Sequence, residues 1–117
     1  MIVEDEHDVL LLYKDYLKIK GYSVIATSTT ADEALLDYKK YKPDLLIMDY
    51  RLPGKKNGIE AAKEILNQNP SVRVLIVSAF ENAKAEIACD KFFSDKNVVV
   101  MIKPLKLTKL VNCIQNI

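Results

Sequence analysis

The sequence has few of the residues that mark specialised protein classes. It contains no tryptophan, three glycines, four prolines, two cysteines and one histidine among 117 residues. The cysteines, Cys89 and Cys113, lack the spacing of a metal-binding pair, and we interpret both as free thiols. Because no tract rich in proline, serine or glycine is present, the composition is that of an ordinary globular protein rather than of a disordered chain.

An excess of one charge and long apolar runs are also missing. Seventeen basic and 16 acidic residues give a net charge of +1, which offers no electrostatic basis for binding nucleic acid or an anionic membrane. The longest apolar stretches, such as Asn97 to Ile102, are far shorter than the roughly 20 residues of a membrane span. No signal peptide precedes the first acidic cluster. We therefore expect a soluble, cytoplasmic protein that forms a single domain over residues 1–117.

What the sequence does contain is an alternation of short apolar runs with segments of helical periodicity, which is typical of βα repeats around a parallel sheet. Five such pairs are predicted. The expected strands are 1–3, 22–27, 44–48, 72–77 and 98–102. The helices that follow them have their apolar positions within 9–17, 34–38, 59–66, 85–92 and 108–117. Hydroxyls of residues 28–30 and the side chain of Asn82 are candidate N-caps.

Polar side chains follow four of the five predicted strands. They are Glu4, Asp5 and Glu6 after the first strand, Asp49 after the third, Ser78 after the fourth and Lys103 after the fifth. The carboxyl ends of parallel strands share one edge of the sheet, where ligands bind. Crowded carboxylates repel one another unless a cation lies between them, and their hard oxygen atoms suit Mg²⁺ or Mn²⁺. Such an ion keeps open positions that a phosphoryl oxygen can fill.

This arrangement leaves Asp49 free to act as a nucleophile. An aspartate carboxylate can attack phosphorus to form an acyl phosphate, and the transfer requires cations beside the moving group. The metal would be one cation. Lys103 is the other, because a lysine two strands away can reach back across the sheet. Ser78, one strand away, can donate its hydroxyl to a phosphoryl oxygen.

Several segments, taken in this order, resemble the CheY-like receiver domain of two-component response regulators. They are Val3–Glu6, Met48–Gly54, Val77–Ala79 and Lys103–Pro104, and the resemblance spans nearly the whole chain. It implies a flavodoxin-like (βα)5 fold, a doubly wound parallel sheet with strand order 2-1-3-4-5 in a single domain. It also implies that a sensor histidine kinase or phosphotransfer protein passes a phosphoryl group from phosphohistidine to Asp49. The only enzymatic activities implied are Mg-dependent self-phosphorylation and autodephosphorylation.

The resemblance also implies how the metal is held. Glu4 and Asp5 would bind Mg²⁺, with Asp5 as the more direct ligand and Glu6 as a bystander. Asp49 and the main-chain carbonyl of Arg51 would complete the protein's share of the metal shell.

The same resemblance implies roles around the phosphoryl group. Ser78 corresponds to the switch hydroxyl that moves toward it, Ala79 to the small residue that leaves room, and Lys103 to the bridge to phosphate. The Lys103–Pro104 bond is a candidate for the cis form, which X-Pro peptides adopt readily. The output surface would be the fifth strand with the helices on either side of it, and a homodimer would form through this face.

One position departs from the family pattern. The family often has an aromatic residue three positions before the lysine, whereas this chain has Val100. Phe80, Phe92 and Phe93 are candidates to replace that aromatic switch, and the sequence leaves the choice open.

Simpler interpretations of each residue also exist. Glu4 to Glu6 could be charges that favour a helix N-terminus, Ser78 a turn hydroxyl, and His7 a surface residue. Their joint placement at one sheet edge favours the functional interpretation for all except His7. A phosphorylation-independent interaction module with a receiver-like fold is the alternative, but it would require loss of the acidic pair, Asp49 or Lys103. A phosphatase of the haloacid dehalogenase type would need a second aspartate where this chain has Arg51.

Overall fold

The structure, a computed structural model, describes residues 1–117 and contains one parallel sheet of five strands. The strands are β1 (Ile2–Val3), β2 (Thr27–Ser28), β3 (Leu45–Asp49), β4 (Arg73–Ser78) and β5 (Val98–Ile102). They lie in the order β2-β1-β3-β4-β5, and every neighbouring pair is parallel. The predicted flavodoxin-like fold and its strand order are therefore confirmed.

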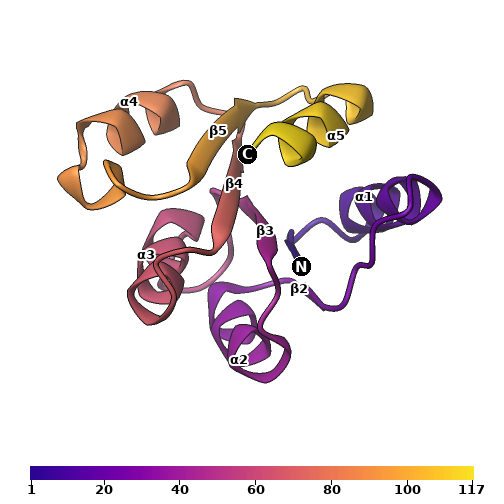
Figure 1. The fold of residues 1–117 in the computed structure, drawn as a ribbon, viewed down its shortest axis with the longest axis horizontal. Coiled ribbons are helices and arrows are strands. Elements are labelled where there is room, and N and C mark those ends of the chain that lie inside the picture. The colour runs from indigo at the N-terminus through magenta and orange to yellow at the C-terminus, as the bar shows by residue number, and fades with distance from the viewer.

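Helices cover both faces of the sheet. They are α1 (His7–Ile19), α2 (Ala31–Tyr41), α3 (Gly58–Gln68), α4 (Asn82–Cys89) and α5 (Leu107–Asn116), with a short 3₁₀ helix, η1 (Lys91–Phe93), after α4. Figure 1 shows α1 and α5 on one side of the sheet and α2, α3 and α4 on the other. None of these helices combines the length and the apolar character that crossing a membrane requires.

Two hydrophobic cores result from this layering. The larger joins the sheet to α2 and α3, and the smaller joins it to α1 and α5. Side chains alternate along β3, so that Leu46 and Met48 enter the larger core while Ile47 enters the smaller one. A strand buried on both faces needs apolar residues at consecutive positions, which is why β3 has the continuous apolar run that the sequence shows.

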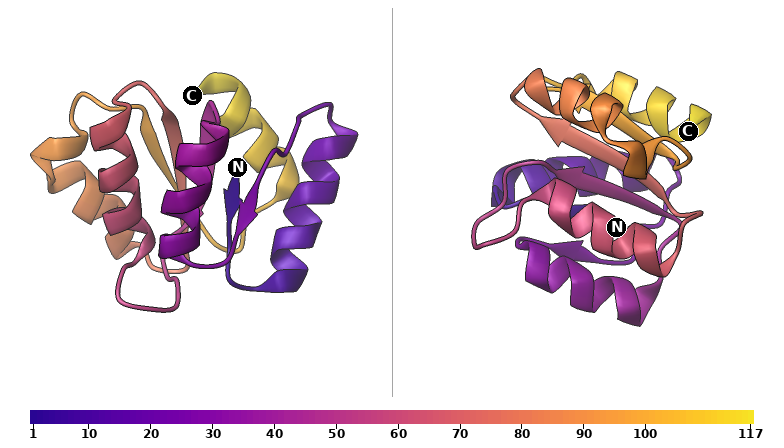
Figure 2. Two further views of the ribbon diagram at one scale, coloured as in Figure 1. Left: turned by 90° about the horizontal axis from the view of Figure 1, so that it is seen from below. Right: turned by 90° about the vertical axis from the view of Figure 1, so that its left-hand side faces the viewer.

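The order of the strands brings the carboxyl ends of β1, β3, β4 and β5 to one end of the molecule. Figure 2 shows the loops that follow β1 and β3 at the same end. The register pairs Asp49 with Val77 across β3 and β4, and Ser78 with Ile102 across β4 and β5. The residues that follow these strands therefore surround a common space.

The prediction of a strand over 22–27 is wrong in its extent. Only Thr27 and Ser28 belong to β2, which pairs with Ile2 and Val3 of the equally short β1. Since β1 has two residues, residues 22–26 have no ladder to join, apart from the Ala26 carbonyl that accepts a bond of 3.1 Å from the Ile2 amide.

The region around α4 also differs from its prediction. Asn82 is the first residue of the helix, whereas Glu81 occupies the N-cap position and makes no side-chain capping bond. The helix ends at Cys89, because the Asp90 carboxylate accepts a bond of 3.0 Å from the Phe92 amide and starts the separate turn η1. Only Ala83 of α4 is buried, so its sequence has little apolar periodicity from which to predict its bounds.

Other local predictions are confirmed. The Thr30 hydroxyl caps α2 by accepting a bond of 3.1 Å from the Glu33 amide. Both cysteines are free, as predicted. The Lys103–Pro104 peptide bond, whose isomer the sequence left open, is cis.

Candidate functional site

Three acidic side chains meet where β1 and β3 end. Asp49 is the last residue of β3 and Glu4 follows β1, and their exposed fractions are 6% and 1%. Asp5, the next residue, is exposed. Each of the three offers a carboxylate oxygen, and these oxygens lie within 4.8 Å of one another. The structure therefore brings together the three carboxylates that the sequence suggested as metal ligands.

Asp5 and Asp49 line a cleft of about 250 Å³ at the carboxyl edge of the sheet. The residues that line it come from the loops after four strands: Asp5, Glu6, Asp49, Arg51, Ser78, Ala79, Phe80 and Lys103. Glu6, expected to be a bystander, lines the cleft, but its carboxylate is not one of the three that cluster. Its amide donates a bond of 3.3 Å to Glu4 Oε1, which helps to orient the buried carboxylate.

Lys103 reaches both buried carboxylates from the end of β5. Its Nζ lies 3.4 Å from Asp49 Oδ1 and 3.5 Å from Glu4 Oε2. Burial alone would lower the pKa of Lys103, but the charges of Asp49 and Glu4 outweigh it and hold that pKa above its ordinary value. Lys103 is therefore protonated and supplies a fixed positive charge beside Asp49.

One lysine does not neutralise the acidic cluster. Burial, and then the neighbouring charge of Glu4, raise the pKa of Asp49 from its ordinary value of 3.8 to about 7. Burial likewise raises the pKa of Glu4. Both shifts show that the site accommodates its full negative charge poorly. A small divalent cation would offset the repulsion among these clustered hard oxygen donors, so the donor set fits a magnesium site.

The backbone around Asp49 is held by the start of α3. A Cβ on Gly58 would lie 2.0 Å from the Asp49 carbonyl oxygen, so only glycine fits at this position. The Gly58 amide donates a bond of 2.7 Å to the Tyr50 carbonyl. Asn57 and Glu60 form a reciprocal capping box at the N-terminus of α3. The loop from Asp49 to α3 therefore has a defined geometry at both ends.

Ser78 lies in the cleft, but its own loop holds its hydroxyl. Its exposed fraction is 1%, and its Oγ accepts a bond of 2.9 Å from the Phe80 amide. The same hydroxyl donates a bond of 3.2 Å to the Phe80 carbonyl. It makes no hydrogen bond to Asp49 or Lys103, so it must turn away from Phe80 before it can contact a group on Asp49.

Two side-chain contacts at or near the cleft were not identified from the sequence. The Arg51 guanidinium lies 4.7 Å from the centre of the Phe80 ring, although the sequence implicated only the Arg51 main chain. The Tyr50 hydroxyl donates a bond of 3.0 Å to Glu86 on α4. These contacts join residues that are far apart in the sequence, and no local pattern marks them. Val100, at the position of the missing aromatic, packs against the larger core.

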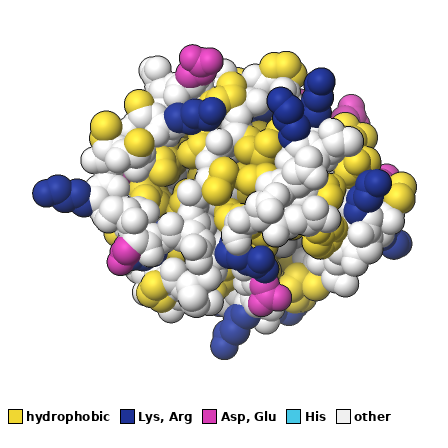
Figure 3. All heavy atoms as spheres, turned by 45° about the horizontal axis from the view of Figure 1, so that its top comes forward, with side chains coloured by type: hydrophobic (Ala, Val, Ile, Leu, Met, Phe, Trp, Pro, Cys, Tyr) yellow, Lys and Arg dark blue, Asp and Glu magenta, His cyan; other side chains and the backbone are white.

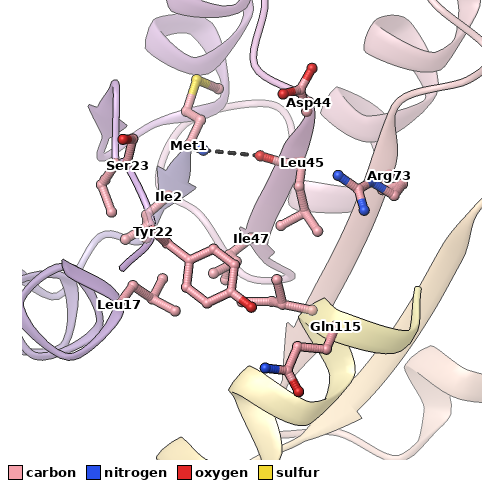
Figure 4. Close-up of a pocket in the computed structure, with 12 residues that line it drawn as sticks. Met1, Ile2, Leu17, Tyr22, Ser23, Asp44, Leu45, Ile47, Arg73 and Gln115 are labelled. Atoms are coloured by element: carbon pink, nitrogen blue, oxygen red, sulfur yellow. Dashed lines mark hydrogen bonds between the residues drawn. The ribbon is translucent and has the colours of Figure 1, made fainter. Parts of the chain in front are cut away.

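A larger cavity, of about 400 Å³, lies away from these residues (Figure 4). It opens between Tyr22–Val24 and β3, where Met1 donates a bond of 2.9 Å to the Leu45 carbonyl. None of the predicted site residues lines it, so the smaller cleft is the candidate functional site despite its size.

Comparisons with known proteins agree with this geometry. The family described as the response regulator receiver domain matches residues 1–115. The chemotaxis protein CheY of Thermotoga maritima is 30% identical over 112 residues, which cover 96% of this chain and 92% of that protein. The probable C4-dicarboxylate response regulator DctR of Bacillus subtilis is 33% identical over 111 residues, or 94% of this chain, but these cover only 47% of its own length.

Solved structures show the same fold. The receiver domain of NtrX from Brucella abortus superimposes with a TM-score of 0.83 at 25% identity, over 98% of this chain and 93% of that one. A chain of the CheX-CheY-BeF3-Mg+2 complex from Borrelia burgdorferi gives a TM-score of 0.84 at 22% identity, over 98% of this chain and 84% of that one. At that identity the second likeness supports the fold alone. With its five-stranded fold and its cluster of Glu4, Asp5 and Asp49, the chain belongs to the response regulator receiver domain family of two-component signalling.

Proposed function

We propose that this receiver domain accepts a phosphoryl group on Asp49 from a phosphohistidine of a sensor histidine kinase or phosphotransfer protein. The observation that carries the proposal is the position of Asp49: its carboxylate lies in an open cleft, 3.4 Å from the Lys103 ammonium and within 4.8 Å of the Glu4 and Asp5 oxygens. A nucleophilic carboxylate, a fixed cation and an acidic metal-type cluster are the three parts that phosphoryl transfer to aspartate requires.

The residues that would hold the metal are Glu4, Asp5, Asp49 and the main-chain carbonyl of Arg51. Mg²⁺ is the ion we propose, with Mn²⁺ as an alternative of the same hard, oxygen-preferring class. When bound, such an ion would offset the negative charge of the cluster and of the incoming phosphoryl group. The raised pKa values of Asp49 and Glu4 support this assignment, because they show how much the carboxylates would gain from a neighbouring cation.

In the proposed transfer, an ionised oxygen of Asp49 attacks the phosphorus atom. A P–O bond forms while the P–N bond of phosphohistidine breaks, and the leaving imidazole keeps the electron pair of that bond and takes up a proton. Lys103, protonated and already 3.4 Å from Asp49 Oδ1, stabilises the charge on the phosphoryl oxygens. Water would later release the phosphoryl group in the slow autodephosphorylation that returns the domain to its resting state.

The Ser78 hydroxyl would convert phosphorylation into a change of shape. It is bonded to Phe80 in this structure and would gain a bond to a phosphoryl oxygen only after the loop after β4 rearranges. Phosphorylation therefore favours one of two loop arrangements, which is a population shift.

The proposed output surface is β5 with α4 and α5. β5 is the edge strand of the sheet, and its Val99 is exposed. In Figure 3, hydrophobic side chains lie together in the middle of the surface, with charged side chains of both signs around them. An apolar surface surrounded by charged side chains suits a protein partner, and a second copy of the chain could form a homodimer there.

Acetyl phosphate with Mg²⁺ tests the proposal, because it can phosphorylate Asp49 without a kinase. Intact-protein mass spectrometry should show the addition of one phosphoryl group, which hydroxylamine removes because it cleaves acyl phosphates. Asp49→Ala should abolish the addition, whereas Asp15→Ala, at an exposed aspartate on α1, should not. An unmodified wild-type protein would refute the proposal and favour a phosphorylation-independent interaction module.

A further inference from the structure

Arg51 and Phe80 join two loops across the rim of the Asp49 cleft. Arg51 lies in the loop after β3 and Phe80 in the loop after β4, and both residues line the cleft. The guanidinium carbon of Arg51 lies 4.7 Å from the centre of the Phe80 ring, which is within the range of a cation–π contact. No side-chain hydrogen bond or ion pair joins the two loops, and the Ser78 hydroxyl bonds only to Phe80.

Phe80 is also the residue that holds the Ser78 hydroxyl. Its amide donates to Ser78 Oγ at 2.9 Å, and its carbonyl accepts from the same hydroxyl at 3.2 Å. Ser78 Oγ cannot turn into the cleft without giving up both bonds. The Phe80 backbone must then move or take new partners, and its ring is held by Arg51. The stacked pair therefore favours the loop arrangement in which Ser78 is turned away from Asp49.

Arg51 has a stronger partner available once Asp49 is phosphorylated. Its guanidinium forms no ion pair in this structure, although it lines the same cleft as Asp49, two residues away in the chain. An exposed cation–π contact is weaker than a charge-assisted, bidentate bond between a guanidinium and a phosphoryl group. A phosphoryl group on Asp49 would therefore draw the guanidinium away from the ring.

We propose that Arg51 is a phosphoryl-responsive latch that stacks on Phe80 while Asp49 is unmodified and transfers to the phosphoryl oxygens when Asp49 is phosphorylated. The transfer releases the Phe80 ring and allows the Ser78 hydroxyl to turn toward the phosphoryl group. This inference rests on the proposed phosphorylation of Asp49. It makes Arg51 a positioning residue through its side chain, in addition to its main-chain role.

The latch also selects among the aromatic residues that could replace the one missing at position 100. Phe92 and Phe93 contact each other edge to face, with ring centres 5.2 Å apart, and Lys63 lies over both rings. Phe93 is buried, so it belongs to the larger core. Phe80 alone is bonded to Ser78 and lines the cleft, so we assign the aromatic part of the switch to Phe80.

Beryllium fluoride with Mg²⁺ tests the latch at equilibrium, because beryllofluoride binds aspartate as a mimic of the phosphoryl group. Phe80→Leu removes the competing stack, so its affinity for beryllofluoride should rise about two- to fivefold above wild type. Arg51→Ala removes both the stack and the proposed bond between the guanidinium and beryllofluoride. Its affinity for beryllofluoride should therefore be about tenfold or more below that of Phe80→Leu. Relative to the wild type, the affinity for beryllofluoride should therefore rise in Phe80→Leu and fall in Arg51→Ala. Opposite changes at two residues in contact are what the latch predicts.

Two variants act as matched controls. Lys55→Ala removes an exposed cation from the same loop as Arg51. Tyr41→Leu removes an exposed ring that also stacks under a lysine, Lys40, at 5.2 Å, and its exposed fraction of 43% matches the 44% of Phe80. Both controls should bind beryllofluoride as the wild type does. Equal effects in the controls, or changes in the same direction for Arg51→Ala and Phe80→Leu, would overturn the latch.

Hydrogen exchange supplies a structural measurement. Beryllofluoride should speed exchange of the Phe80 amide in the wild type, because Ser78 Oγ no longer accepts its hydrogen bond. In Arg51→Ala this acceleration should be smaller at the same occupancy. Unchanged Phe80 exchange in a wild-type protein that binds beryllofluoride would reject the latch while leaving the phosphorylation of Asp49 intact. A wild type that neither binds beryllofluoride nor takes up phosphate would reject the proposed function itself.

Discussion

Replacing Asp49 with asparagine should stabilise the metal-free protein, even though it removes the proposed phosphorylation site. Asp49 is 6% exposed and close to the carboxylates of Glu4 and Asp5, and its pKa is raised to about 7 by burial and by Glu4. Ionised Asp49 is therefore costly in the folded state. An asparagine of nearly the same shape carries no charge and can donate a hydrogen bond to a neighbouring carboxylate.

The magnitude follows from the shift in pKa. A change from 3.8 to about 7 corresponds to at most about 4 kcal/mol of destabilisation when Asp49 is ionised. Water in the open cleft screens part of this energy, and the substitution removes one of the two carboxylates beside Lys103. We therefore expect Asp49→Asn to raise the free energy of unfolding by about 1–2 kcal/mol at pH 8.

The sign of the pH dependence is also determined. Between pH 3.8 and about 7, the folded protein binds more protons at Asp49 than the unfolded chain does, because the pKa is higher in the folded state. The contribution of Asp49 to the free energy of unfolding therefore falls as the pH rises through that window. Above about pH 7 the ionised carboxylate destabilises the folded state to its full extent. Asp49→Asn should show a shallower fall than the wild type, with a remaining slope from Glu4, whose pKa is also raised by burial.

Urea unfolding in the presence of EDTA, at several pH values from 5 to 8, measures both quantities. Added Mg²⁺ should then stabilise the wild type more than Asp49→Asn, because the ion relieves a repulsion that the variant lacks. Asp15→Asn, at an exposed position on α1, is the control and should match the wild type. If Asp49→Asn were equally stable or less stable at pH 8 without metal, the reasoning about charge crowding would be wrong.

Three further predictions concern neighbours of Asp49. Lys103→Met removes the cation 3.4 Å from Asp49, so phosphorylation by acetyl phosphate should slow about a hundredfold, and an unchanged rate in a phosphorylation time course would contradict the role of Lys103. Asp5→Ala should weaken Mg²⁺ binding by more than about tenfold in a spectroscopic titration, whereas equal affinity would place the metal elsewhere. Gly58→Ala places a Cβ 2.0 Å from the Asp49 carbonyl oxygen, so it should lower the free energy of unfolding, measured in urea, by about 1–3 kcal/mol. An unchanged free energy of unfolding would mean that α3 can shift to relieve the clash.

Much of the fold could be predicted because local patterns specify it. Residues 98–102 were predicted as a strand and form β5, and the apolar run before Asp49 forms the buried strand β3. The prediction of strand 22–27 was wrong because the extent of a strand depends on its partner, and β1 has only two residues. The bounds of α4 were missed because a helix with one buried residue has almost no apolar pattern.

The residues of the site also divide into those that the sequence could identify and those that it could not. Five site residues could be identified from the sequence because each ends a strand or lies within two residues of a strand end: Glu4, Asp5, Asp49, Ser78 and Lys103. The contacts of Arg51 with Phe80 and of Tyr50 with Glu86 could not. Both join residues more than 25 positions apart through exposed or half-buried side chains, which neither apolar periodicity nor turn chemistry constrains.

By itself the sequence determined which chemical groups stand at the ends of the strands: four carboxylates, one hydroxyl and one lysine. Only the tertiary structure decided what these groups do to one another. Because β3 lies between β1 and β4, Lys103 comes within 3.5 Å of carboxylates 54 and 99 positions earlier in the chain. The same arrangement buries Asp49 beside Glu4 and raises its pKa to about 7. Local periodicity carries no information about which strands are neighbours, so the charge balance of the site comes from the order of the sheet.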